Sequence, residues 1–223
     1  MLKLEELKEW FETIWNILVD INISINNIER LINRKNEEEN KLRRVHGFFN
    51  YHFHQLRFIM VIQLFNLFSN KSNDKRSFYK LTNRLKNDKY DSKLKKLLFN
   101  NKLYEDTHLF KSKKDIINEV SLIDLDIQQN LYLIKKVMNI RDMAYAHKDP
   151  KVVEPIIITT KELRTLVDFA VNIYNQLSSK LFNTQAYFDT VDSWDIGNII
   201  DQLIDYRNLT DKKKLMKISA TNK

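Results

Sequence analysis

The segment from residue 141 to residue 150 carries the side chains best suited to chemistry on a phosphate. Arg141 is followed directly by Asp142 and, after four more residues, by His147. A histidine with an ordinary pKa of about 6.5 takes up or releases a proton at neutral pH. An arginine can bind two phosphate oxygens at once and stabilise the charge of a transition state. By residue type, the histidine suits proton transfer and the arginine suits binding of an anion.

Helical periodicity places Arg141 where a leucine would normally stand. Ile134 and Met138 precede it on one apolar stripe, and burying a guanidinium there costs several kcal/mol unless it faces a cleft or an anion. On an ideal α-helix, Arg141 and His147 would point about 120° apart. Pro150 disfavours helical geometry at the residue before it. We therefore expect the helix to unwind near His147, so that the two side chains converge or face a second pair across a symmetry axis.

The elements that must position these residues are predicted to be helices. Only two glycines and two prolines occur in 223 residues, too few turn-formers for a β-sandwich, a barrel or a Rossmann sheet. A 3-4 spacing of apolar residues predicts long helices over residues 4–32, 45–68 and 113–141. A fourth, capped by Thr159 with Glu162, reaches residue 181. The prediction is an all-α fold, an antiparallel four-helix bundle.

Shorter elements complete the predicted organisation. The polar residues 33–44 form either the first connection or an exposed helical end, and residues 152–160 are expected to run extended. A last helix is expected to be capped by Asp192 or Ser193, with a polar tail from Asp211 that frays. We predict a helical bundle over residues 1–182, in which residues 71–112 form a basic insertion with short helices near 78–85 and 93–99, followed by a C-terminal helix and tail over residues 183–223.

The excess positive charge lies in one segment. The chain has a net charge of +8, but residues 71–114 hold 14 basic and 5 acidic residues, whereas the remainder holds 23 and 24. This segment is either a solvated insertion or a surface for a polyanion such as RNA. Tyr79, Tyr90 and Tyr104 within it either stack on bases or anchor it to the bundle. The candidate RNA contacts are Lys93, Lys95, Lys96, Lys111, Lys113, Lys114 and, beside the histidine, Lys148.

Residue types and spacing argue against a metal or cofactor site. His52 and His54 stand two residues apart, so on a helix they point to opposite sides and cannot chelate one metal. Asp189, Asp192 and Asp195 are better explained as helix caps than as magnesium ligands. The chain has no cysteine, no glycine-rich phosphate loop and no apolar run longer than residues 58–62. We expect no metal, no cofactor, no membrane segment and a cytoplasmic location.

The segment around Arg141 resembles the HEPN superfamily, whose hallmark is an Arg, a polar residue and a His, with four to six residues between Arg and His. Here five residues separate Arg141 from His147, and Asp142 is the polar residue. The resemblance extends over residues 1–182 and points to the abortive-infection branch. It includes the motif at the end of the third long helix, the Phe-rich second helix ending in Leu-Phe-Asn-Leu-Phe (64–68), Ser-Phe-Tyr-Lys-Leu (77–81) and Ala-His-Lys-Asp (146–149).

The resemblance implies a metal-independent endoribonuclease of a prokaryotic anti-phage or toxin–antitoxin system. It implies a homodimer through the Arg141/His147 face, with an antitoxin or defence protein as a further partner. RNA would be cut by attack of a 2′-OH, leaving a 2′,3′-cyclic phosphate, and Asp142 would orient His147 or hold the unwound helix end. One toxin subgroup carries a modifiable Tyr shortly after the His. Lys148, Asp149 and Pro150 stand there instead, so that regulation is not expected.

Two other functions stay open on the sequence alone. The first is a catalytically silent HEPN module that binds RNA or a protein partner within a defence complex. The second is a helical dimerisation domain that does not contact nucleic acid.

Overall fold

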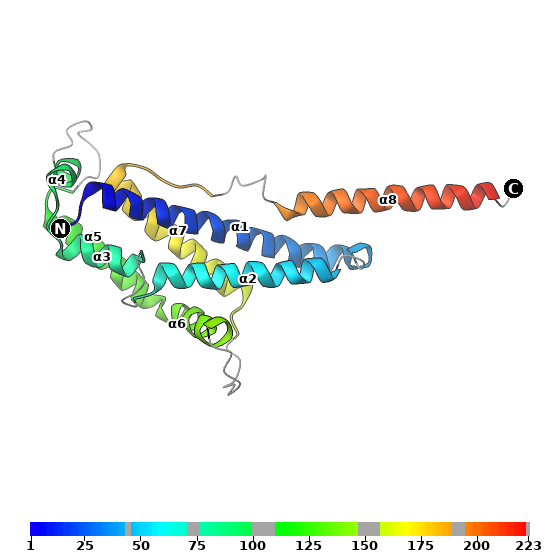
Figure 1. Ribbon diagram of the computed structural model, residues 1–223, viewed down its shortest axis with the longest axis horizontal. Helices are drawn as coiled ribbons and strands as arrows, with labels where there is room; N and C mark the ends of the chain where they lie inside the picture. Colours follow the sequence, from blue (N-terminus) through cyan, green and yellow to red (C-terminus); the bar gives the residue numbers. More distant parts are fainter. Residues whose placement is uncertain (43–45, 71–75, 100–109, 147–156, 189–194, 222–223) are drawn as a thin grey trace. The chain divides into compact units, whose positions relative to one another are not determined.

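The computed structural model describes residues 1–42, 46–70, 76–99, 110–146, 157–188 and 195–221 (Figure 1). Throughout these ranges the regular elements are helices, and the only β-type contact described is an isolated bridge between Leu2 and Tyr90. The predicted all-α class is therefore confirmed. None of the helices in the described ranges is both long and apolar enough to cross a bilayer.

Several helix boundaries agree with the apolar periodicity. The basic segment contains two short helices, as predicted, and Thr159 caps the last long helix before residue 182. In chain order the elements are α1 (Leu4–Leu42), α2 (His46–Phe68), α3 (Phe78–Asn87), α4 (Ser92–Phe99), α5 (Lys113–Gln129), α6 (Leu131–Ile140), the π-helix η2 (Arg141–Ala146), α7 (Thr160–Phe182) and α8 (Ile196–Thr221).

The prediction of one long helix over residues 113–141 is wrong. Asn130 separates α5 from α6 with φ −91° and ψ 6°, and α6 leaves in a new direction (Figure 1). The amide of Asn130 donates a hydrogen bond to the carbonyl of Asp126 at 3.0 Å, and its own backbone N–H bonds the same carbonyl at 3.2 Å. A side chain that competes for a helical acceptor in this way favours a turn over a helix interior.

Two expectations about the ends of helices change. α1 continues to Leu42, so the polar stretch is a helical end as far as that residue. The tail from Asp211 is helical to Thr221 and not frayed, because its lysines, leucine and methionine are good helix formers. Asp192 and Ser193 lie outside the described residues. Asp195 instead caps α8, since its carboxylate accepts a hydrogen bond from the N–H of Gly197 at 2.7 Å.

The chain divides into two compact units. Unit one comprises Met1–Asn22 and Ile59–Phe188, and unit two comprises Ile23–Phe58 and Asp189–Lys223. α1 and α2 each contribute one part to each unit. The predicted domain boundary after residue 182 stays a prediction.

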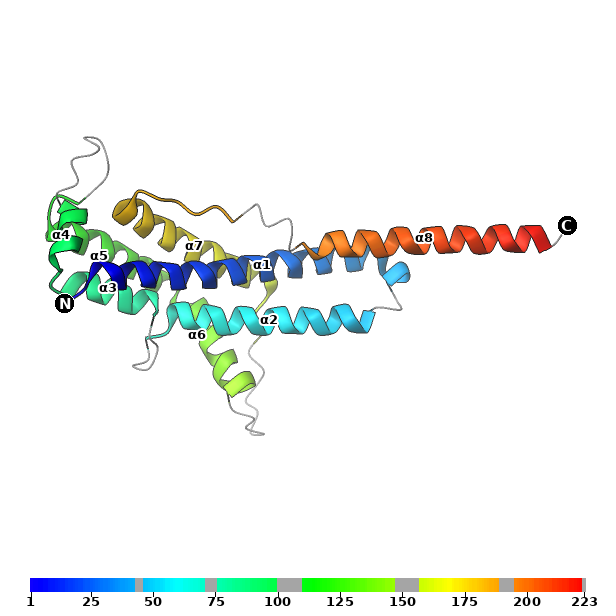
Figure 2. The same ribbon diagram turned by 45° about the horizontal axis from the view of Figure 1, so that its top comes forward.

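Unit one is held together by apolar and aromatic contacts among its helices. The ring of Phe11 on α1 packs edge-on against Phe182 of α7 at 4.9 Å. Phe68, at the end of α2, stacks on Phe169 of α7 at 5.7 Å and contacts Phe78 of α3 at 5.6 Å. Figure 2 shows α3 beside α5. Fully buried members of this core are Leu7, Ile14, Leu18, Met60, Leu64, Ile116, Ile123, Leu163 and Leu166.

The basic segment is part of this core where it is described. Phe78, Leu81 and Leu85 of α3 and Leu94 and Leu98 of α4 are all fully buried. The interpretation of the segment as a solvated insertion is therefore wrong for residues 76–99. Its apolar stripes pack inward, and its lysines and arginines lie on the remaining faces.

Unit two contains the second part of α1, the first part of α2 and α8. Ile196 donates its backbone N–H to the side-chain oxygen of Asn27 on α1 at 3.0 Å. Arg30 of α1 lies 3.4 Å from the carboxylate of Asp195. These two contacts attach the start of α8 to α1.

The packing around Phe68 predicts a large loss of stability on truncation. Phe68→Ala should lower the free energy of unfolding by about 3–5 kcal/mol, because it removes a buried ring between Phe78 and Phe169. Phe48→Ala, the same change at a side chain that is 65% exposed, should cost at most about 1 kcal/mol. Urea denaturation followed by circular dichroism measures both. Equal losses for the two variants would contradict the described core.

Candidate functional site

Arg141 is positioned by α6, and α6 is attached to the first turn of α7. Lys136 of α6 lies 2.6 Å from Oε1 of Glu162, and both side chains are at most one quarter exposed. The other carboxylate oxygen of Glu162 accepts the backbone N–H of Thr159 at 2.8 Å and closes the predicted capping box. The hydrogen bond from Lys136, together with that from Thr159, lowers the pKa of Glu162 to about 2.

The guanidinium of Arg141 rests on an aromatic ring. Its central carbon lies 4.4 Å from the ring centroid of Phe65 on α2, and Phe65 is itself buried. A guanidinium at this distance over a ring is attracted by the ring quadrupole. Nη1 of Arg141 lies 2.7 Å from Oδ1 of Asp142, and the Arg141 side chain is 32% exposed.

These contacts give Arg141 and Asp142 defined partners. Arg141 is partly exposed and has a ring and a carboxylate beside it. Asp142 is ion-paired with Arg141, and its expected role in orienting His147 or holding the helix end stays a prediction. His147 and Lys148 lie outside the described residues, so the convergence of Arg141 and His147 stays a prediction.

The backbone at Arg141 departs from the α-helix. Residues Arg141–Ala146 form a π-helix, in which hydrogen bonds run to the fifth residue along the chain and the turn is wider. Regular α-helical geometry thus ends at Arg141 itself. The unwinding that Pro150 was expected to cause near His147 lies outside the described residues and stays a prediction. The angle of about 120° calculated for an ideal α-helix does not apply to this segment. Turns of this kind are rare and occur frequently at functional sites.

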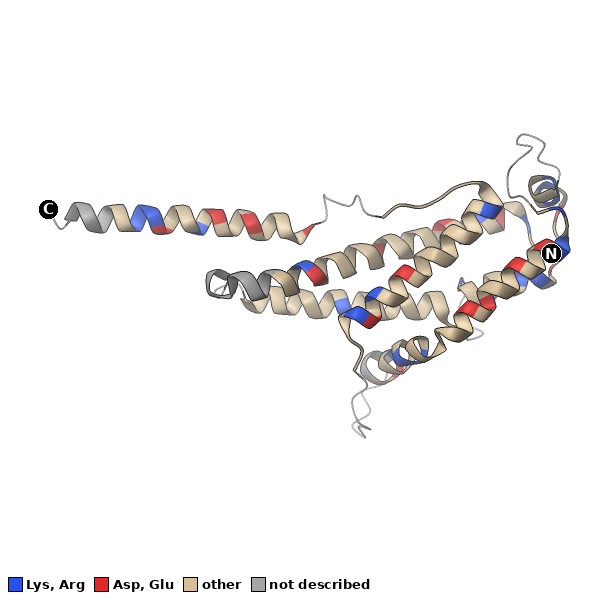
Figure 3. Ribbon diagram, turned by 180° about the vertical axis from the view of Figure 1, so that it is seen from behind, with Lys and Arg blue, Asp and Glu red and all other residues tan. Residues whose placement is uncertain are grey.

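Five of the predicted RNA-binding lysines are exposed. Lys93, Lys95 and Lys96 project from α4, and Lys111 and Lys114 flank the start of α5. In Figure 3, the blue of lysine and arginine is visible at the end of unit one that contains α4 and the start of α5. No ion pair is described for these five among the residues that the structure covers. They form the basic face of unit one.

Lys113 is different because its ammonium is already engaged. It donates a hydrogen bond to the backbone carbonyl of Asp88 at 2.8 Å and lies 5.2 Å over the ring of Tyr90. Tyr90 is buried, its hydroxyl donates to the carbonyl of Leu85, and burial raises its pKa to about 12. Tyr90 therefore anchors the segment and does not stack on bases, whereas Tyr104 lies outside the described residues.

Other basic residues of the segment are neutralised by acidic groups far away in the sequence. Arg84 pairs with Glu6 of α1, in addition to its neighbour Asp88 within the segment. Lys86 lies 2.5 Å from the carboxylate of Asp124 on α5. Arg76 pairs with Glu9 of α1 at 2.9 Å. Counting charges along the sequence could not detect these partners, so the local surplus overstates the exposed positive charge.

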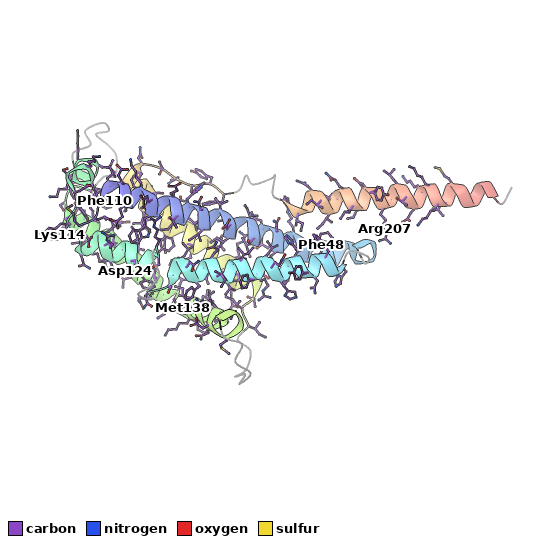
Figure 4. All side chains as sticks on the ribbon, viewed as in Figure 1. Phe48, Phe110, Lys114, Asp124, Met138 and Arg207 are labelled. Carbon is purple, nitrogen blue, oxygen red and sulfur yellow. The ribbon has the colours of Figure 1, made fainter. Side chains whose placement is uncertain are left out.

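The basic face and Arg141 are not brought together. The lysines cluster at α4 and the start of α5, whereas Arg141 follows α6, beyond the other end of α5 (Figure 2). The 17 residues of α5 alone span about 25 Å. Lys114 and Met138 mark these two regions in Figure 4. An RNA strand would need several nucleotides to reach from one to the other.

Phe65 is the member of the site that sequence reasoning missed. It belongs to a phenylalanine-rich helix, so nothing in the local pattern distinguishes it from its neighbours. Its contact with Arg141 joins residues 76 positions apart. Within the described part of the chain, no group of three or more histidines and carboxylates is arranged to hold a metal ion.

Comparison of the chain with protein-family models, with curated proteins and with solved structures found no significant match. The function proposed below is therefore argued from the residues of the chain and from the resemblance of its motif.

The depressed pKa of Glu162 makes stability depend on pH in acid. Its carboxyl has a pKa of about 2 instead of 4.5, so folding favours the ionised form. This stabilisation is complete above pH 4.5 and is lost as the pH falls toward 2. The melting temperature should fall over this window, and less steeply in Glu162→Gln than in the wild type.

At pH 7 the Glu162→Gln variant should be less stable by about 1 kcal/mol, because its capping box and ion pair are weakened. Thermal denaturation at several pH values measures both effects. Glu12→Gln, at an exposed position on α1, serves as the control and should leave the pH profile unchanged. Identical profiles for the wild type and Glu162→Gln would contradict the described ion pair.

Proposed function

We propose that this chain is a HEPN-type endoribonuclease that cleaves RNA without a metal ion. The observation that carries the proposal is that Arg141 is held in place by its contacts and is still accessible to solvent. Its guanidinium is fixed by Phe65 and Asp142 and is nevertheless about one third exposed. A cation that is held in place and still reachable by solvent is suited to binding a phosphate. Its location in a π-helix, a feature frequent at functional sites, supports the same conclusion.

The proposed reaction is a transesterification within the RNA strand. A general base removes the proton of a 2′-OH, whose oxygen then attacks the adjacent phosphorus. The bond from phosphorus to O5′ breaks, and a general acid gives O5′ a proton. The products are a 2′,3′-cyclic phosphate and a 5′-OH. His147 supplies this proton transfer, and Arg141 binds the phosphate oxygens as negative charge accumulates on them.

The proposal also covers the fold around the site, the oligomeric state and the cellular role of the protein. The four principal helices form an antiparallel HEPN-like bundle, and two copies meet through the Arg141/His147 face, so that one histidine acts as base and the other as acid. The enzyme works in the cytoplasm of a prokaryote as the effector of an abortive-infection or toxin–antitoxin system. An antitoxin or another defence protein restrains it.

Cleavage of total RNA in the presence of EDTA tests the catalytic proposal. His147→Ala should reduce the rate about 100-fold or more, because the proton-transfer group is lost. Arg141→Ala should reduce it by a similar factor, because charge on the phosphate is no longer stabilised. Lys135→Ala, which removes an exposed cation from α6, serves as the matched control and should retain the wild-type rate.

Two results would reject this function. One is the absence of cleavage by the wild-type protein, and the other is equal cleavage by the wild type and His147→Ala. A rate that depends on added divalent cations would reject the metal-independent mechanism.

The second candidate function is a catalytically silent HEPN module that binds RNA or a protein partner. The basic face favours RNA binding, because five exposed lysines gather there, away from Arg141. Such a surface attracts phosphates through counterion release and gives an affinity that falls steeply with salt. This function predicts binding without cleavage.

Neutralising the lysines of α4 tests RNA binding for both functions. The triple variant Lys93→Gln, Lys95→Gln, Lys96→Gln should weaken binding of single-stranded RNA at least tenfold. It should also reduce the slope of log K against log salt by about 2. The control carries the same change at three dispersed exposed lysines, Lys3, Lys135 and Lys161. Fluorescence anisotropy measures both, and equal effects in the two triple variants would show that the basic face is not the binding surface.

A further inference from the structure

α8 has an exposed apolar row in addition to its buried one. Ile196, Ile200 and Ile204 are buried. Other apolar residues of the same helix are exposed, namely Ile199 (56%), Leu203 (40%), Tyr206 (71%), Leu209 (58%), Leu215 (67%) and Met216 (68%). Four of these six, Ile199, Tyr206, Leu209 and Met216, form one row along the helix. An exposed apolar row on a helix with polar neighbours is typical of an interaction surface.

The exposed row follows a heptad. Ile199, Tyr206 and Lys213 stand seven residues apart and occupy position a. Gln202, Leu209 and Met216 follow each of them by three residues and occupy position d. All six are exposed. Four of the six positions are apolar, which is the pattern of a short coiled-coil seam interrupted at two polar positions.

The charges along α8 are unevenly distributed. Exposed Asp201 and Asp205 lie in its first half together with Arg207, and exposed Lys212, Lys213 and Lys214 lie in its second half together with Asp211, so the first half is net acidic and the second half net basic. Figure 3 shows acidic colour toward the start of α8 and basic colour toward its end. A helix with this polarity is complementary to a second copy of itself that runs in the opposite direction.

We propose that α8 is a self-association surface through which two copies of this chain pair as an antiparallel coiled coil. In antiparallel pairing, a positions face d positions of the other helix. Ile199 then lies opposite the partner's Met216, and Tyr206 lies opposite the partner's Leu209. Gln202 meets the partner's Lys213 in the polar layer, where its carbonyl oxygen accepts from the ammonium. Each layer occurs twice because the contact is two-fold symmetric.

The charges select this direction over the parallel one. In the antiparallel register Asp205, at position g, lies beside the partner's Lys212, also at position g, and this pair too occurs twice. A parallel pair would instead place Lys213 against the partner's Lys213 in the seam. Like charges in direct apposition destabilise such a contact. The antiparallel arrangement therefore buries the apolar row and also places opposite charges beside each other.

This surface is separate from the proposed site. Every residue in the argument belongs to unit two, whereas Arg141 and Phe65 belong to unit one. Self-association through α8 does not require the chain to cleave or bind RNA. The two proposals can therefore fail independently of each other.

Disulfide trapping tests the register, because the natural chain contains no cysteine. The double variant Ile199→Cys, Met216→Cys should become a covalent dimer under mild oxidation, as judged by non-reducing gel electrophoresis. The two positions are 17 residues apart on one helix, about 25 Å, so they cannot join within a chain. Each single variant should give at least tenfold less dimer, because each cysteine then faces an unmodified side chain.

Other outcomes of the trapping experiment overturn the proposal. Efficient dimerisation of Ile199→Cys alone would indicate parallel or random contacts. The absence of covalent dimer in the double variant would show that α8 does not pair in this register.

Charge exchange gives a second readout in the Ile199→Cys, Met216→Cys background, where a dimer formed through the Arg141/His147 face is not counted. Asp205→Lys and Lys212→Asp should each lower the yield of covalent dimer about fivefold or more, measured by non-reducing gel electrophoresis. The double exchange should return the yield to within about twofold of that of the parent double-cysteine variant. Circular dichroism confirms that each variant is folded. If the single exchanges leave the yield unchanged, or if the double exchange is no better than the single ones, the antiparallel pairing is rejected.

Discussion

Glu162 uses its two carboxylate oxygens for two different partners, and the position of the candidate site depends on both contacts. One oxygen caps α7 through the N–H of Thr159, and the other binds Lys136 of α6 at 2.6 Å. α6 changes direction at Asn130, so the periodicity of α5 does not determine where its far end lies. The ion pair contributes to that constraint together with the buried Ile134 and Val137 of α6, and it links the helix that ends at Ile140 to the first turn of α7.

The site combines a fixed cation with an irregular backbone. Arg141 lies over the buried ring of Phe65 and against Asp142, at the residue where α-helical geometry gives way to a π-helix. A preorganised cation needs no rearrangement when a phosphate arrives, which is the condition for effective electrostatic stabilisation of a transition state. The basic face lies at the opposite end of α5. In the proposed function it would guide an RNA strand to the protein and would take no part in the chemical step.

Much of the fold could be predicted from the sequence, because it depends on local patterns. The all-α class, the helix from residue 46, the two short helices of the basic segment and the Thr159–Glu162 capping box all follow from neighbouring residues. The break at Asn130 was missed because the apolar spacing continues across it. The contact of Arg141 with Phe65, and the pairing of Arg84 with Glu6, depend on tertiary packing between distant residues. A charge or aromatic count along the chain contains no information on such contacts.

In the proposed function, Arg141 and His147 cleave RNA through its own 2′-OH. The chemistry of the product ends tests this mechanism. A defined RNA oligonucleotide is incubated with the wild-type protein in the presence of EDTA, and the masses of the fragments are determined by mass spectrometry. Fragments ending in a 2′,3′-cyclic phosphate, with 5′-OH on their neighbours and no cut at a 2′-deoxy position, are the predicted result. Intact RNA, or fragments with 3′-OH and 5′-phosphate ends, would contradict the proposed mechanism.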